Sequence, residues 1–195
     1  MISLGKITEL AHHTVCSIIG EGDRVVDATA GNGHDTIFLA EAVGPSGQVY
    51  AFEIQKDALL KTAERLKQKN LDKRVTMIHS GHERLFNYIS YPVSIIMYNL
   101  GYLPGGDRQI TTKYDTTLES LKQALTLLKV GGIITIVFYP GHEQGADEKK
   151  HLLSFCRNLN ASEYAVLHKV LLNQGNNPPE LMVVQKKLFC SDLSG

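Results

Sequence analysis

The sequence predicts a single α/β domain in which helices wrap a mostly parallel sheet. Short apolar runs alternate with helical patterns along the whole chain, and a glycine loop joins the first such run to the helix that follows it. The length of 195 residues suffices for one substantial core and is too short for two ordinary domains with a linker. We therefore expect one domain over residues 1–187, followed by a tail over residues 188–195.

The first half of the chain supplies three helices and three strands. The helices repeat apolar residues at intervals of three and four, as Leu59, Ala63 and Leu66 do. They are expected at residues 7–19, 34–42 and 56–70. The strands are short apolar runs bounded by glycine or polar turns, expected at residues 24–28, 48–53 and 74–79.

The second half continues the alternation and closes the sheet. A continuous apolar run predicts a central strand at residues 93–99, and a strand is also expected at 133–139, after the glycine pair 131–132. Helical spacing predicts helices at residues 117–128 and 148–158. The runs 164–172 and 181–187 flank a turn rich in Asn, Gly and Pro, and predict an antiparallel hairpin at the end of a seven-stranded sheet.

Composition excludes several other classes of protein. The hydrophobic fraction of 43% and the charged fraction of 21% are typical of a globular chain. Lys6, Glu9 and His12 interrupt the only apolar stretch near the N-terminus, so we expect no export signal, no membrane span and a cytoplasmic protein. Three widely spaced cysteines without a C-x-x-C pair predict neither a disulfide framework nor a zinc knuckle.

The charge balance gives no global preference for nucleic acid. Lys+Arg and Asp+Glu both number 20. Between residues 56 and 74, however, seven basic residues accompany three acidic ones. This local excess is compatible with contacts to RNA phosphates, and equally with a solvated helix face.

A cofactor loop follows the first predicted strand. The strand ends at Asp27, and the chain turns through Gly31 and Gly33 into a helix, which lets the backbone approach a ligand closely. Glu53 ends the second strand 20 residues later, where a carboxylate can accept both hydroxyls of an adenosine ribose. The dinucleotide motif fails because Thr36 stands where it needs a third glycine. The pattern therefore favours S-adenosylmethionine.

Further residues complete the predicted cofactor site. The third strand ends near Ser80 and His82, the candidates for holding adenine. Asp35 either binds the methionine amino group or caps the helix. His79 and His82 have the spacing of metal ligands, but no third ligand accompanies them and no metal is expected. The predicted cofactor contacts are Asp27, Gly31, Asn32, Gly33, His34, Asp35, Thr36, Glu53, Gln55, Ser80, His82 and Asn99.

A polar turn after the fourth strand is the predicted acceptor site. Amino-methylating enzymes of this fold carry Asn/Asp-Pro-Pro-Tyr/Phe here. This chain has Asn99 in the first position and Tyr102 in the last, with Leu100 and Gly101 replacing the prolines. A plain strand-ending turn would also select Asn and Gly. The predicted catalytic residues are Asn99, Tyr102, and, at the end of the fifth strand, Tyr139 and His142.

Three ordered motifs together resemble one family. They are residues 27–36, residues 99–107 and residues 138–142, and the resemblance covers residues 6–187. The family is that of the small bacterial methyltransferases labelled putative rRNA methylases. The resemblance implies a Rossmann-like class I methyltransferase fold with S-adenosylmethionine as cofactor.

The resemblance also implies a substrate and an assembly. Members methylate the aminomethyl nitrogen of 5-aminomethyl-2-thiouridine at the tRNA wobble position, which implies binding of the anticodon stem-loop and a homodimer. Two alternatives remain open. One is an rRNA or small-molecule N-methyltransferase, which would keep the cofactor residues and differ in the acceptor loops. The other is a non-catalytic RNA-binding protein with a vestigial cofactor pocket.

Overall fold

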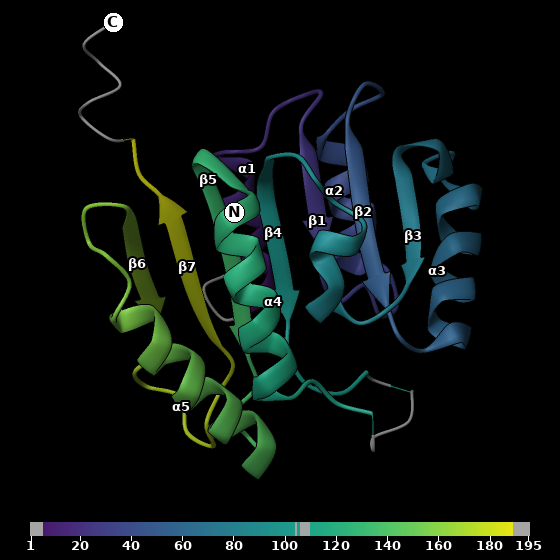
Figure 1. Ribbon diagram of the computed structural model, residues 1–195. Helices are drawn as coiled ribbons and strands as arrows, with labels where there is room; N and C mark the ends of the chain where they lie inside the picture. The colour runs from purple at the N-terminus through teal and green to yellow at the C-terminus, as the bar shows by residue number, and fades with distance from the viewer. Residues whose placement is uncertain (1–5, 104, 106–109, 189–195) are drawn as a thin grey trace, which may run out of the picture.

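The computed structural model describes residues 6–103, 105 and 110–188, which form a seven-stranded sheet covered by helices on both faces (Figure 1). The strand order is β3-β2-β1-β4-β5-β7-β6. All neighbouring pairs are parallel except those that β7 makes with β5 and β6. The predicted fold class and the closing antiparallel hairpin are therefore confirmed. The strands are β1 Arg24–Asp27, β2 Gln48–Glu53, β3 Val75–His79, β4 Val93–Asn99, β5 Leu128–Phe138, β6 Tyr164–Lys169 and β7 Glu180–Lys186.

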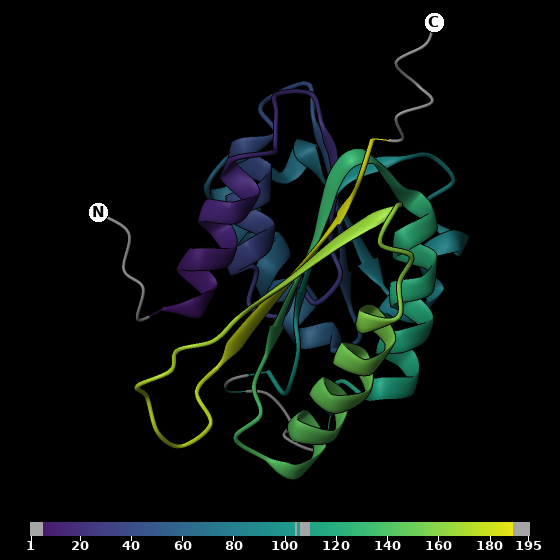
Figure 2. The ribbon, with the colours of Figure 1, turned by 90° about the vertical axis from the view of Figure 1, so that its left-hand side faces the viewer.

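Two layers of helices enclose the sheet (Figure 2). The first layer packs its apolar side chains in one core cluster, and the second layer in another. Strand β4 serves both clusters, because Ile95 and Met97 face the first and Ile96 and Tyr98 face the second. The first layer contains α1 Ile7–Cys16, α2 His34–Ala42 and α3 Lys56–Gln68; the second contains the 3-10 helix η2 His82–Asn87, α4 Tyr114–Leu127 and α5 Glu143–Arg157.

Most predicted boundaries lie within three residues of the observed ones, and α2, β2 and β4 match. The start of β5 was predicted wrongly. It begins at Leu128 and runs through Gly131 and Gly132. Gly131 has φ +79°, and a Cβ on Gly132 would lie 2.7 Å from the Ser94 carbonyl oxygen. The glycines therefore permit a β-bulge and close contact with β4, where the sequence suggested a turn.

Helix α5 was also predicted to start too late, at residue 148. It begins at Glu143 because the His142 ring caps its N-terminus, with Nδ1 accepting from the Gly145 N–H at 3.1 Å. Two 3-10 helices, η1 Asp72–Arg74 and η2, lie where no helix was predicted. The first helix ends at Cys16 and β6 ends at Lys169, each three residues before the predicted end.

Three features of the sequence can be followed in the fold. Within the described ranges no helix is both long and apolar enough to cross a bilayer. Cys16 is exposed and Cys156 is buried, both as free thiols, and burial raises the pKa of Cys156 to about 12. The third cysteine and all of the predicted tail except Leu188 lie outside the described residues.

Candidate active site

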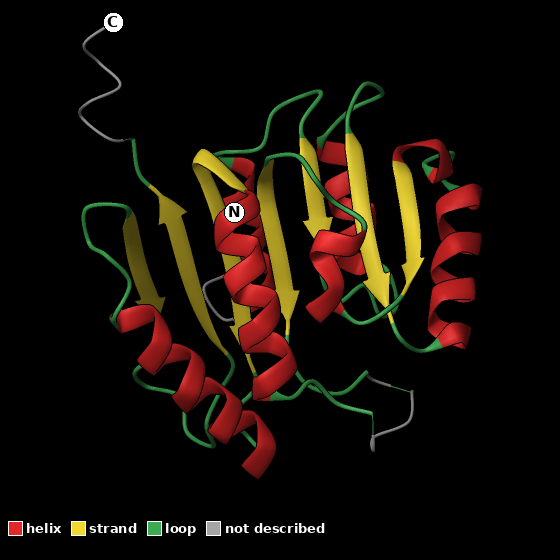
Figure 3. Cartoon of the chain, viewed as in Figure 1, coloured by secondary structure: helices red, strands yellow, loops and turns green. Residues whose placement is uncertain are grey.

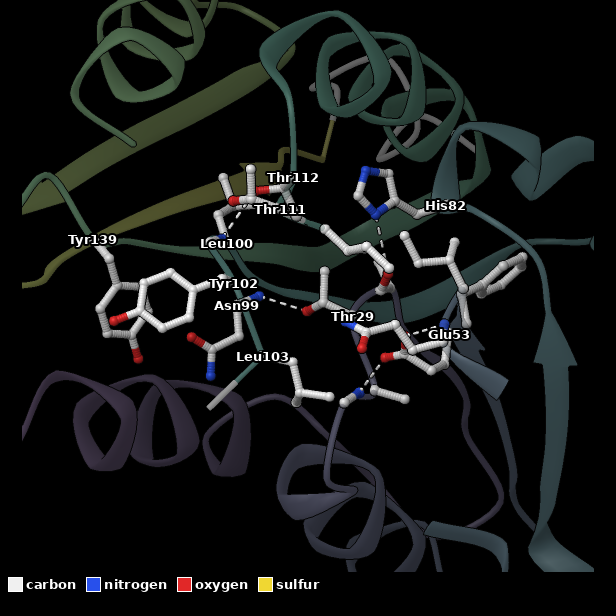
Figure 4. A pocket seen from close by; sticks show the side chains of 18 of the residues that line it. Thr29, Glu53, His82, Asn99, Leu100, Tyr102, Leu103, Thr111, Thr112 and Tyr139 are labelled. Carbon is white, nitrogen blue, oxygen red and sulfur yellow. Dashed lines mark hydrogen bonds between the residues drawn. The ribbon is translucent and has the colours of Figure 1, made fainter. Parts of the chain in front are cut away.

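The parallel strands all end at one edge of the sheet (Figure 3). A pocket of about 840 Å³ is lined by the loops at this edge. The loops after β1, β2, β3, β4 and β5 all contribute to its wall. A cavity of this size can enclose most of a drug-sized ligand. The close-up shows Glu53 and His82 at one end and Asn99, Tyr102 and Tyr139 at the other (Figure 4). We call these the cofactor half and the acceptor half of the pocket.

The cofactor half is built around the turn from β1 into α2. Glu53 accepts the Gly31 N–H at 2.8 Å through Oε2 and the Gln55 N–H at 2.6 Å through Oε1. Gly31 has φ +49° and Gly33 has φ +78°, conformations that glycine adopts without strain. A Cβ on Gly33 would lie 2.5 Å from Thr62 Cγ2. The backbone angles therefore favour glycine at both positions, and at Gly33 the space behind the loop requires it as well.

Asp27 supports this loop from behind. It is fully buried and accepts the Thr36 hydroxyl at 2.6 Å and the Thr29 N–H at 3.1 Å. Burial and the neighbouring Asp35 charge raise the pKa of Asp27 to about 7. Asp27, Gly33 and Thr36 do not belong to the pocket wall, unlike the other predicted cofactor residues.

His82 fixes the position of the loop after β3. Its Nδ1 donates to the Ala28 carbonyl at 3.1 Å, and its ring packs edge-on against Tyr98 at 5.7 Å. Burial lowers the pKa of His82. His79 is turned away and bonds the Ile54 carbonyl at 3.0 Å, so the two histidines do not converge as metal ligands would. Ser80 also lines the pocket.

The acceptor turn, residues 99–102, is fixed by side chains from other loops. The Asn99 N–H donates to Thr29 Oγ1 at 2.7 Å, so the loop after β1 fixes the start of the acceptor turn. Gly101 has φ +123°, and its N–H donates to Thr112 Oγ1 at 2.9 Å. Proline has neither that φ nor an N–H, so the departure from the two-proline motif is a structural requirement of this turn.

Hydrogen bonds fix the orientation of two residues of the turn that line the pocket, Asn99 and Leu100. Asn99 Nδ2 donates to Asp35 Oδ2 at 3.4 Å, and Asn99 also bonds the Tyr139 hydroxyl. Leu100 lines the pocket beside Asn99 and directs its N–H to the Val137 carbonyl at 3.0 Å.

Aromatic side chains close this half of the pocket. The Tyr102 ring is 43% exposed and lies 5.9 Å from the His142 ring. Burial and the Asp35 charge raise the pKa of Tyr139, so its hydroxyl stays protonated at neutral pH. Within the described part of the chain, His142 Nε2 and Thr111 Oγ1 are buried without a partner. Within the motif at residues 99–107, Pro104, Gly106 and Asp107 lie outside the described residues.

Two residues beside the site, His12 and Glu148, were not predicted from the sequence. His12, on α1, holds Asp35 Oδ1 at 2.6 Å and stacks on Phe38 with ring centroids 3.9 Å apart. Helix α5 contributes Glu148, which bonds Thr112. A histidine in a helix and a glutamate in a charged helix are common on protein surfaces, and only the packing of α1 and α5 brings these two to the pocket.

Known proteins with similar sequences identify the family to which this architecture corresponds. The family model of putative rRNA methylase matches residues 49–185. A relative from Arabidopsis thaliana, the chloroplastic tRNA (mnm(5)s(2)U34)-methyltransferase, is 38% identical over 179 residues. That match covers 87% of this chain and 65% of the relative, so the chain spans just under two thirds of the relative's length.

Two solved structures extend the similarity to the whole fold. A putative rRNA methylase from Clostridium thermocellum is 42% identical with a TM-score of 0.92, covering 94% of this chain and 99% of that one. A putative methyltransferase from Streptococcus mutans, in complex with SAH, is 36% identical with a TM-score of 0.86, covering 95% and 99%.

Proposed function

The chain belongs to the family of putative rRNA methylases, which places it among the S-adenosylmethionine-dependent methyltransferases, and we propose that it methylates the aminomethyl nitrogen of 5-aminomethyl-2-thiouridine at the tRNA wobble position. The product would be 5-methylaminomethyl-2-thiouridine. The observation that carries the proposal is the acceptor turn, whose residues Asn99, Leu100 and Tyr102 line the pocket. The name of the Arabidopsis relative supports the choice of tRNA.

The cofactor half of the pocket fits S-adenosylmethionine. Each Glu53 oxygen accepts one backbone N–H, which leaves lone pairs for ribose hydroxyls. Gly31 exposes backbone close to the pocket, while Ser80 and His82 lie where adenine is expected. When bound, this cofactor supplies an electrophilic methyl group on a sulfonium.

The acceptor half orients a nitrogen nucleophile. Asn99 Oδ1 and the Leu100 carbonyl accept hydrogen bonds from the amine, which directs the nitrogen lone pair, and Tyr102 packs against the base. Holding reactants in line lowers a barrier by up to about 7–11 kcal/mol, so positioning accounts for most of the catalysis. The chain needs no covalent nucleophile.

The amine must also lose a proton, because an alkylammonium ion has no lone pair. Tyr139 is a poor base, since its raised pKa keeps the hydroxyl protonated. His142 uses its Nδ1 lone pair to accept the Gly145 N–H, so its neutral form carries the proton on Nε2. Asp35 is in contact with Asn99 and paired with His12. We assign proton removal to this pair; His12, whose side chain is 28% exposed, connects it to solvent.

Recognition of the anticodon stem-loop, a homodimer and a cytoplasmic location are further parts of the proposal. The basic segment supports RNA contact only in part. Arg65 and Arg74 bond backbone carbonyls of the protein, and Lys69 pairs with Glu41 at 3.1 Å. Lys149 likewise pairs with Glu180 at 2.8 Å. Lys61 borders a small hollow beside the glycine loop and is the best placed of these for a phosphate.

The alternatives predict different products. An rRNA substrate fits the description of the family, and would give transfer to ribosomal RNA. A small-molecule acceptor draws weaker support, since demethylmenaquinone methyltransferases match over only 61 residues, 31% of this chain. A non-catalytic RNA-binding protein would not need Gly31, Gly33 and Glu53 arranged as they are.

Nucleoside analysis of tRNA from cells lacking this protein tests the proposal. We expect 5-aminomethyl-2-thiouridine to accumulate, and purified protein to methylate that tRNA in preference to ribosomal RNA. Unchanged 5-methylaminomethyl-2-thiouridine, in cells with no second enzyme for the step, would refute the tRNA assignment. Transfer to ribosomal RNA alone would favour the rRNA alternative.

A further inference from the structure

Glu148 is a buried carboxylate that the proposed reaction does not use. Glu148 is 2% exposed, and no ion pair joins it to a described Lys, Arg or His side chain. Burial raises the pKa of Glu148, while two threonine hydroxyls and the His142 charge oppose that rise. Burying a carboxyl group without a cation is unfavourable unless hydrogen bonds compensate, so the arrangement of these bonds is informative.

One bond of Glu148 leads to the acceptor turn. Thr112 Oγ1 donates to Glu148 Oε2 at 2.7 Å and accepts the Gly101 N–H at 2.9 Å. The Thr112 N–H in turn donates to the Gly101 carbonyl at 3.2 Å. Gly101 is thus held through both of its backbone polar groups. Because a hydroxyl has one proton, Glu148 determines that Thr112 directs its lone pair toward Gly101.

The other bond of Glu148 leads away from the turn and fixes the carboxyl group itself. Thr117 Oγ1, on α4, donates to Glu148 Oε1 at 2.6 Å and lies 3.4 Å from His82 Nε2. Thr117 is fully buried. Both carboxyl oxygens are therefore engaged, and the Glu148 side chain cannot rotate without breaking one of these bonds.

We propose that Glu148 is a positioning residue of the methyltransferase, which fixes the conformation of the acceptor turn through Thr112 and Gly101. The proposal rests on the proposed function, because the turn is taken to hold the acceptor nitrogen. Gly101 lies two residues after Asn99 and directly before Tyr102. A shift of the Gly101 backbone would therefore move the groups that contact the acceptor while leaving Glu53 and the glycine loop in place.

Matched variants test this role. Thr112→Val removes the hydroxyl with little change in volume, and Thr112→Ser keeps it. Ser94→Ala removes a buried hydroxyl that lies outside the pocket wall and is bonded to the Arg24 carbonyl. We expect Thr112→Val and Glu148→Gln to lower turnover on tRNA by about tenfold, because a small displacement of the acceptor from its in-line position is enough to slow the reaction by that much. Cofactor affinity should stay within about twofold, and Thr112→Ser and Ser94→Ala should retain turnover.

Hydrogen exchange of the Gly101 amide gives a readout that needs no substrate. In Thr112→Val and Glu148→Gln the exchange rate of this amide should rise about tenfold or more relative to wild type, since a broken hydrogen bond exposes it. The double variant should exchange no faster than Thr112→Val alone, because both changes break one chain of bonds.

The outcomes separate the two levels of the proposal. Unchanged Gly101 exchange in both variants would overturn the positioning role, as would variants that lose only thermal stability and retain wild-type turnover. If wild-type protein transfers no methyl group to tRNA, the proposed function fails, and the Gly101 amide alone decides whether Glu148 fixes the turn.

Discussion

The two halves of the pocket differ in how far their residues lie apart in the chain. The cofactor half comes from neighbouring strand–loop–helix units, so the contacts that Gly31 makes with Glu53 and Thr62 span 22 and 31 positions, and the contact of His82 with Ala28 spans 54. The acceptor half gathers α1, the ends of β4 and β5, and α5. Its contacts join residues as far apart as Asn99 and Thr29, 70 positions. Local spacing therefore encodes the cofactor half, whereas packing of distant helices creates the acceptor half.

If the two halves have separate functions, Asn99→Ala should have the largest effect on methyl transfer with the least effect on cofactor affinity. Removing the amide should lower methyl transfer to tRNA by about a hundredfold, because an orienting contact to the nucleophile is lost. Cofactor affinity should remain close to that of wild type. Single-turnover assays at saturating cofactor and calorimetry measure the two quantities.

Asn173→Ala, in an exposed loop, is the control for an asparagine outside the pocket wall. Normal transfer by Asn99→Ala together with a collapse of cofactor affinity would mean that the turn belongs to the cofactor half instead.

Glu53→Ala should have the opposite effect. Hydrogen bonds to a charged group contribute about 1.5–3 kcal/mol each, so loss of the ribose acceptor should weaken cofactor binding by tenfold or more. The Gly31 and Gln55 amides also lose their acceptor. At saturating cofactor, turnover should recover toward wild type. Calorimetry that finds unchanged affinity would remove Glu53 from the cofactor half.

Gly33→Ala tests whether the cofactor loop depends on its backbone angles. A left-handed φ in a residue with a Cβ costs about 1–2 kcal/mol, and the new Cβ would also press on Thr62. We expect a comparable loss in the free energy of unfolding, measured in urea. Gly175→Ala is the matched control, because its Cβ would meet nothing within 4 Å. Equal stability of the two variants would show that the loop relaxes freely.

The same contrast explains what the sequence could predict. Glu53 was placed correctly at the end of β2 because strand length and alternation are local properties. His12 and Glu148 could not be found, since their partners Asp35 and Thr112 are fixed only when α1 and α5 pack on the sheet. The β5 start was wrong because a glycine pair has the same appearance in a turn and in a bulge. The bond of Thr29 to Asn99 was not foreseeable from the loop alone, because the two residues lie 70 positions apart.

Tyr139→Phe should give the smallest effect and sharpens the assignment of the proton acceptor. The hydroxyl bonds Asn99, and losing one neutral hydrogen bond costs about 0.5–1.5 kcal/mol, so transfer should fall a few-fold.

Transfer by wild type should rise between pH 7 and pH 9, as the protonated alkylamine loses its proton. Because burial and Asp35 raise the pKa of Tyr139 above its ordinary value of 10.0, its hydroxyl stays protonated across that range. Tyr139→Phe should therefore lower the rate at every pH without changing the slope of the profile. A profile that becomes flat in Tyr139→Phe would make the tyrosine the group that titrates, and would take proton removal away from Asp35 and His12.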